Sequence, residues 1–297
     1  MKSAEDARQT LLSMTDIFSL GLSEAEFAKL STLIYGTCGI KMPPHKKSML
    51  ESRLRRRLRS LGLTSFGGYC DFLFTGGGME QELTSLIDVV TTNKTDFYRE
   101  AAHFDFLVDR ALPELIDSFG VGFDRPLRLW SAGCSTGEEP YSLAMVLSEF
   151  GRVNPGFSFS ILATDISTEV LSKAARGVYA AEKVEPVPEE CKRRYLLRNR
   201  EGEKKLVRIV PELRSLVSFR HLNFMDEDYG IREHFDFIFC RNVIIYFDRP
   251  TQQTFLHRLC DHLDDERYLF MGHSETLHGM QLPLGQKAPA VYRKHAP

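Results

Sequence analysis

A glycine-containing loop followed at once by two carboxylates is the segment of this chain best suited to bind a ligand. The segment reads Leu129-Trp-Ser-Ala-Gly-Cys-Ser-Thr-Gly-Glu-Glu-Pro-Tyr-Ser142, which is typical of a buried strand, a loop and a helix start. A helix start presents unpaired N–H groups and the positive end of the helix dipole, which favour a phosphate. Glu138 and Glu139 would repel a diphosphate there, whereas a cationic ligand with a ribose would tolerate them. The pattern therefore favours S-adenosylmethionine, which carries a sulfonium and an ammonium but no phosphate.

An aspartate ends the next apolar run, Phe157 to Asp165. An acidic group at a strand end can accept both ribose hydroxyls of a nucleotide-like ligand. Asp165 could equally cap the following helix, as could Ser167. Gly133 and Gly137 allow close approach of a ligand to the backbone, but the dinucleotide fingerprint Gly-x-Gly-x-x-Gly is absent. An NAD enzyme is disfavoured by Glu138 and Glu139.

Polar side chains follow a later apolar run, Phe235-Asp-Phe-Ile-Phe-Cys-Arg-Asn-Val-Ile-Ile-Tyr-Phe247. Arg241 and Asn242 come directly after the predicted strand, where open parallel sheets bind their ligands. Tyr246 lies in the apolar segment beyond. The alternative interpretation is a turn asparagine and a core tyrosine.

The segment Thr91-Thr-Asn-Lys-Thr-Asp-Phe-Tyr-Arg99 precedes the loop in the sequence. Asn93 or Thr95 is predicted to cap a helix, which would place Arg99 about one turn later. Arg99 is then either a ligand for a carboxylate of the cofactor or substrate, or an ordinary solvated arginine.

The first third of the sequence is typical of a small all-helical domain. Ser23-Glu-Ala-Glu26 matches a capping box, and Gly36 and Gly39 are expected to close that helix. We predict a disordered segment over residues 1–15, the helical domain over 16–90 and a second domain over 91–297. Further helices are expected near residues 45–61, 64–74 and 80–90.

From Pro126 onward, apolar runs rich in β-forming residues alternate with helical stretches. Continuous apolar runs predict strands buried on both faces, and therefore a parallel sheet covered by helices. Residues 178–219 are charged and contain two prolines and a hairpin-like turn, which predicts an inserted small β subdomain. Strands are expected at residues 127–131, 157–164, 217–222, 235–240 and 268–271.

Composition excludes few classes beyond membrane-spanning and fibrous proteins. The 297 residues are 43% hydrophobic and 26% charged, with a net charge of −2, as in globular proteins. Neither a signal-peptide core nor an apolar run of about 20 residues is present. The six scattered cysteines are expected to be reduced thiols of a cytoplasmic protein, with Cys134 as a less favoured nucleophile.

Residues 45–61 form the strongest charge feature, a predicted helix rich in arginine. Its leucines at positions 50, 54, 58 and 61 make one narrow apolar face. The arginine stripe is open to three interpretations: a solvated surface, a nucleic-acid contact or a docking surface for an acidic protein.

Taken together, these segments resemble the chemotaxis receptor methyltransferase family, usually called CheR. The resemblance runs from Leu22 to Tyr292 and includes the segments above together with Gly272-His-Ser-Glu275. It implies an α/β fold: an N-terminal all-helical domain, and a doubly wound Rossmann-like S-adenosylmethionine-dependent methyltransferase domain with an inserted small β subdomain. It also implies methyl transfer to glutamate side chains of chemoreceptors, which yields methyl esters.

The resemblance assigns roles to individual residues. Arg99 and Tyr246 match positions that line the methyl-transfer site, and Asp165 would hold the ribose. Arg53 and Arg59 match positions of receptor contact, with Arg57 beside them. Gly133 and Cys134 depart from the two alanines of known relatives, but both are small, so binding should persist. The implied cofactor site comprises Asn93, Thr95, Arg99, Glu139, Asp165, Asn223, Phe224, Arg241 and Asn242.

The implied partners are the cytoplasmic methylation helices of chemoreceptors, and in some relatives a receptor C-terminal peptide held by the β subdomain. We expect a cytoplasmic monomer that uses no metal, binds no nucleic acid and does not insert into a membrane. A nucleic-acid methyltransferase would carry a motif such as Asn-Pro-Pro-Tyr, which is absent. The remaining alternative is an S-adenosylmethionine-binding regulatory or scaffold protein without activity, although every matched position is filled.

Overall fold

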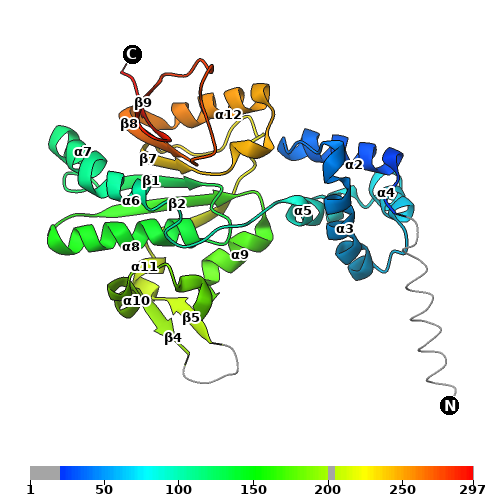
Figure 1. Ribbon diagram of the computed structural model, residues 1–297, viewed down its shortest axis with the longest axis horizontal. Coiled ribbons are helices and arrows are strands. Elements are labelled where there is room, and N and C mark those ends of the chain that lie inside the picture. The colour runs from blue at the N-terminus through cyan, green and yellow to red at the C-terminus, as the bar shows by residue number, and fades with distance from the viewer. Residues whose placement is uncertain (1–20, 200–204, 297) are drawn as a thin grey trace. The chain divides into compact units, whose positions relative to one another are not determined.

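The computed structural model describes residues 21–199 and 205–296, so the expected disorder over residues 1–15 lies outside the described residues. The chain divides into two compact units, one up to Thr92 and one from Asn93 onward (Figure 1). In the described part of the chain, no helix is both long and apolar enough to span a bilayer.

The first unit is helical, as the sequence predicts. Ser23 accepts from the backbone N–H of Glu26 while Glu26 caps Ser23 in return, so the capping box is confirmed. Leu50, Leu54 and Leu58 are fully buried, which confirms the narrow apolar face of the basic helix. The elements are α2 (Glu24–Cys38), η1 (Pro44–Lys46), α3 (Lys47–Leu61), α4 (Phe66–Phe74) and α5 (Met79–Val90).

The second unit is built on a seven-stranded sheet in the order β6-β2-β1-β7-β8-β10-β9. Its parallel part confirms the α/β prediction and comprises β6 (Val217–His221), β2 (Phe159–Asp165), β1 (Leu127–Ala132), β7 (Phe235–Cys240) and β8 (Leu263–Met271). An antiparallel pair, β9 (Leu284–Ala288) and β10 (Val291–Lys294), extends one edge. This pair was not predicted, because its strands are short and mostly polar.

Helices cover both faces of the sheet, as expected for strands buried on two sides. Side chains of β1 alternate between two cores: Leu127 and Leu129 belong to one, and Trp130 and Ala132 to the other. In Figure 1, α8 (Glu138–Val153) and α12 (Arg249–Asp261) lie on opposite sides of the sheet. Further helices outside the predicted insertion are α6 (Ala102–Phe106), η2 (Leu107–Ala111), α7 (Leu112–Phe119), α9 (Thr168–Arg176) and η4 (Ile244–Tyr246).

A small antiparallel sheet, β3-β5-β4, lies within the segment predicted to be inserted. Residues 217–219 of that segment instead pair with β2 in the main sheet. The small sheet and its neighbours are β3 (Val178–Ala180), η3 (Ala181–Val184), α10 (Glu189–Tyr195), β4 (Leu196–Arg198), β5 (Leu206–Ile209) and α11 (Pro211–Arg214).

Candidate functional site

The loop after β1 is fastened to the end of β2 by Asp165. One carboxylate oxygen of Asp165 accepts from the Ser135 N–H at 2.8 Å, and the other accepts from the Ser167 N–H at 2.9 Å. Ser167 itself caps α9, as one of the two sequence interpretations expected. Asp165 therefore shapes the loop after β1, because both of its carboxylate oxygens bind the backbone.

Gly133 begins this loop in the left-handed region, with φ of +84°. A Cβ at this position would lie 2.5 Å from Cγ2 of Val243, so the close approach requires glycine. The loop after β1 thereby packs against the segment after β7. Cys134, the next residue, is fully buried and burial raises the pKa of its thiol well above the usual value, which removes it as a nucleophile.

The two carboxylates at the start of α8 have different environments. Oε2 of Glu139 lies 2.6 Å from Nε of Arg241, and its Oε1 accepts from the Ser131 hydroxyl at 2.7 Å. Oε2 of Glu138 accepts from the Thr136 hydroxyl, and burial raises the pKa of Glu138. Glu138 and Glu139 were both expected to repel a diphosphate, but the charge of Glu139 is already matched by Arg241.

Arg241 joins this pair to the segment before α6. Its Nη1 donates to the backbone oxygen of Arg99 at 2.6 Å and lies 3.5 Å from Oε2 of Glu100 and 3.4 Å from Nδ1 of His103. The guanidinium is therefore enclosed by acceptors from three segments of the chain. Sequence reasoning assigned Arg241 to the cofactor; the structure shows that its side chain organises the site.

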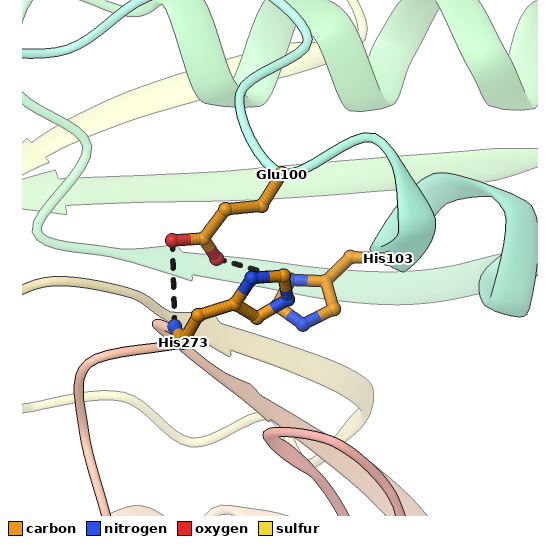
Figure 2. A group of neighbouring side chains, drawn as sticks. All are labelled: Glu100, His103 and His273. Carbon is orange, nitrogen blue, oxygen red and sulfur yellow. Dashed lines mark hydrogen bonds and ion pairs between the residues drawn. The ribbon is translucent and has the colours of Figure 1, made fainter.

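Glu100, His103 and His273 form a compact group, shown in Figure 2. The Glu100 carboxylate lies between the His273 backbone N–H at 3.4 Å and Nδ1 of His103 at 3.5 Å. Burial, and after it the nearby Arg241 charge, lower the pKa of His103 to about 4, so its imidazole is neutral at pH 7. These three side chains could together bind a metal ion. However, the positively charged Arg241 already lies beside Glu100 and His103.

Residues 91–101 contain no helix, so the helix start predicted at Asn93 or Thr95 is wrong; α6 begins only at Ala102. Tyr98 and Glu100 have positive φ, which a helix cannot accommodate. Hydrogen bonds to the loop after β1 and to α8 hold the segment instead. Ser135 donates to the backbone oxygen of Asn93 at 2.9 Å, and the Tyr98 N–H donates to Ser142 at 3.0 Å.

The other predicted site residues come from the same unit. Arg99 donates to the Lys94 carbonyl at 3.3 Å, and the Thr95 carbonyl accepts from Lys183 of η3 at 3.2 Å. Asn223 and Phe224 follow β6, where the Leu222 N–H donates to the Asp165 carbonyl at 3.0 Å.

Asn242 and Tyr246 lie beyond the end of β7. Asn242 has a φ of +60°, and Tyr246 is half-buried in η4. The carboxyl ends of β6, β2, β1 and β7 therefore gather the predicted residues along one edge, as the topology requires.

A separate hollow of about 440 Å³ lies between residues 273–284 and the β9–β10 hairpin. None of the predicted cofactor residues lines it.

The arginines predicted to bind a receptor lie on α3 in the helical unit, in different environments. Arg53 donates to the Val90 and Thr91 carbonyls at 2.6 and 2.8 Å, which caps the end of α5. Arg57 binds Glu82, which is 1% exposed, through both carboxylate oxygens. Arg59 is exposed. Sequence periodicity could not distinguish these environments, because all three arginines lie outside the leucine face.

Comparison with known proteins identifies the family of this site. Residues 93–288 match the family described as CheR methyltransferase, SAM binding domain, and residues 25–91 match its all-alpha domain. The chain belongs to the CheR methyltransferase family. The resemblance stated from the sequence is thus confirmed, as is its fold: an all-α domain and an S-adenosylmethionine-dependent methyltransferase domain.

Relatives named chemotaxis protein methyltransferase cover almost the whole chain. The one from Escherichia coli is 41% identical over 95% of this chain and 94% of its own length. The one from Borreliella burgdorferi is 39% identical over 93% of this chain and 96% of its own length. Chemotaxis protein methyltransferase 2 of Pseudomonas aeruginosa is 43% identical over 84% of this chain and 86% of its own length.

Proposed function

We propose that this protein transfers a methyl group from S-adenosylmethionine to glutamate carboxylates of chemoreceptors, forming methyl esters. The observation that carries the proposal is the joint framework of Asp165, Glu139 and Arg241, which ties the segment of Arg99 to the ends of β1, β2 and β7. The curated relatives, named for chemotaxis methyl transfer over nearly their full length, support the same activity.

The residues present fit this cofactor. Asp165 ends β2, where an acidic group would accept from the ribose hydroxyls. Asn223 and Phe224 would contact the adenine, whereas Asn93, Thr95, Arg99 and Asn242 would surround the remainder. We assign Glu139 and Arg241 to the support of these groups as well as to binding, because each is the other's counter-ion.

Little acid–base chemistry is needed from the protein. S-adenosylmethionine supplies a methyl group on positively charged sulfur, which is ready for in-line displacement. A glutamate is ionised at neutral pH, so no general base is needed. Arg99 would offset the charge of the incoming carboxylate, and Tyr246 would orient its oxygen. The rate then depends mainly on alignment and on exclusion of water.

The finer partner and environment assignments belong to the same proposal. The substrate would be the cytoplasmic methylation helices, with Arg59 of α3 as a contact, and the β3-β5-β4 sheet would take a receptor C-terminal peptide where one exists. We also propose that the protein is a cytoplasmic monomer. It would need no metal ion, because Arg241 provides the positive charge beside Glu100 and His103.

Methyl-labelled S-adenosylmethionine with receptor cytoplasmic fragments tests the proposal. We expect alkali-labile label on the receptor, because methyl esters hydrolyse in base, and no label when glutamates of the methylation helices are replaced by alanine. Tight binding of S-adenosylhomocysteine without label on any receptor would favour the regulatory alternative. Alkali-stable label would contradict glutamate as the acceptor.

A further inference from the structure

The segment Gly272-His-Ser-Glu275 follows β8, and its carboxylate has no role in the site described so far. Glu275 is buried, with 5% of its surface exposed. Its Oε2 accepts from the Asn242 N–H at 2.8 Å and from the Gly272 N–H at 2.7 Å, and its Oε1 accepts from the Ile244 N–H at 2.9 Å. A single side chain thus holds the turn after β8 and the segment after β7 together.

Only backbone donors compensate the charge of this carboxylate. Within residues 21–199 and 205–296, no lysine, arginine or histidine lies within ion-pair distance of Glu275. Burial raises the pKa of Glu275, while hydrogen bonds from Gly272, Asn242, Ile244 and Val243 oppose that rise. Converging N–H groups of this kind form a concave anion site, and here the anion belongs to the chain itself.

The held segment carries two predicted functional residues. Asn242 occupies the left-handed region with φ of +60°, which asparagine adopts more readily than most residues with a Cβ. Ile244 is the first residue of η4, so its N–H has no partner within that helix. Glu275 accepts a hydrogen bond from this N–H, at the start of the turn that ends in Tyr246. The side-chain amide of Gln252 in α12 donates to the backbone carbonyls of Ile244 and Phe247, and so holds the same turn from the other side.

Gly272 shows how closely the two turns approach. A Cβ at this position would lie 2.4 Å from Nδ2 and 2.9 Å from the backbone N of Asn242, and 2.9 Å from Oε2 of Glu275. Any larger residue would separate the carboxylate from its donors. Gly272 and Glu275 therefore both contribute to the contact with Asn242: the glycine allows the close approach, and the glutamate accepts the hydrogen bonds.

We infer that Glu275 is a positioning residue for methyl transfer, which fixes Asn242 and the Tyr246 turn at the end of β7. The inference rests on the proposed function, which assigns Tyr246 to the acceptor and Asn242 to the cofactor. Glu275 itself touches neither cofactor nor acceptor; it acts through the backbone of the segment that it binds.

Glu275→Gln tests the inference, because it keeps the side-chain size but turns an N–H donor toward backbone donors. We expect the single-turnover methyl-transfer rate per folded molecule to fall about 10- to 100-fold, since small misplacements have such effects. The dissociation constant for S-adenosylhomocysteine should rise only about threefold. Gly272→Ala should give the same pattern, because it disrupts the same contact from the opposite side.

Asp236→Asn is the matched control. Asp236 is a buried carboxylate at the start of β7, the strand whose following segment Glu275 binds, and it binds Arg125, Arg267 and the Arg128 N–H. This variant should lose stability but keep the transfer rate and cofactor affinity of the folded fraction. If Asp236→Asn slows transfer as much as Glu275→Gln does, the loss reflects general destabilisation and the inference fails.

Amide hydrogen exchange gives a readout independent of activity. Peptides covering Asn242, Ile244 and Gly272 should exchange at least tenfold faster in Glu275→Gln than in the wild type or in Asp236→Asn. Unchanged exchange there, or a wild-type single-turnover rate, would overturn the inference. Absence of methylation by the wild type contradicts the proposed function alone, because the exchange result still reports on the Glu275 contact.

Discussion

Glu139 and Arg241 form a buried ion pair that joins the first turn of α8 to the end of β7, with Nε and Oε2 2.6 Å apart. Their side chains are 10% and 3% exposed. Removing one member of such a pair leaves an uncompensated buried charge, which typically costs about 3–5 kcal/mol. The pair therefore stabilises the second unit, and by our proposal it also supports the cofactor site.

A double-mutant cycle measures this link. We expect Glu139→Gln and Arg241→Met each to lower the free energy of unfolding by about 3–5 kcal/mol, and the double variant to lose less than the sum. Trp130 is the single tryptophan and is fully buried in β1, so its fluorescence in urea reports on the second unit. Additive losses would show that the two side chains do not interact.

The fold followed from the sequence wherever apolar runs were long. Phe235–Cys240 is a buried parallel strand as predicted. In contrast, β8 begins at Leu263, although the prediction began at Tyr268, because four consecutive charged residues after Leu263 interrupt the apolar pattern. The charged and polar β9–β10 hairpin gave no signal at all, since an edge pair needs little apolar surface.

The sequence could nominate residues for the candidate site, but it could not indicate how they pair. Glu139 and Arg241 are 102 positions apart, and no local pattern indicates that one neutralises the other. The segment around Arg99 was misjudged for a similar reason: hydrogen bonds from Ser135 and to Ser142 hold it in a non-helical conformation, and these partners lie far along the chain. Glu275 ends the segment Gly272–Glu275 that carries the family resemblance and Glu100 follows Arg99, but only their contacts reveal what they do.

The depressed pKa of His103 predicts a pH dependence of stability. Its folded pKa is about 4, against 6.5 when unfolded. Between these values the unfolded chain binds more protons, so the contribution is full above pH 6.5 and is lost as pH falls toward 4. From pH 7 to pH 5 this amounts to about 2 kcal/mol. His103→Asn, which retains an acceptor for Arg241, should flatten the dependence of unfolding free energy measured at these two pH values. An unchanged slope would contradict the assignment.

Tyr246→Phe separates orientation of the acceptor from cofactor binding. The hydroxyl is predicted to orient the acceptor oxygen, so its removal should slow single-turnover transfer about tenfold or more. The affinity for S-adenosylhomocysteine, measured by calorimetry, should stay within twofold of the wild type. A weakened affinity with an unchanged rate would instead place Tyr246 in the cofactor site.

The arginines of α3 should separate into structural and docking residues. Arg57→Met removes the guanidinium that compensates the buried Glu82, so we expect the helical unit to lose about 3 kcal/mol of stability, read from its helical circular dichroism in urea. Arg59→Ala should leave stability unchanged but raise the KM for receptor fragments about two- to fivefold at low salt.

That rise should disappear at about 0.5 M salt, where exposed charges are screened. Arg152→Ala, which removes an exposed arginine of α8, is the matched control and should leave KM unchanged. Equal effects of Arg59→Ala and Arg152→Ala would show that net charge, rather than a docking surface on α3, attracts the receptor.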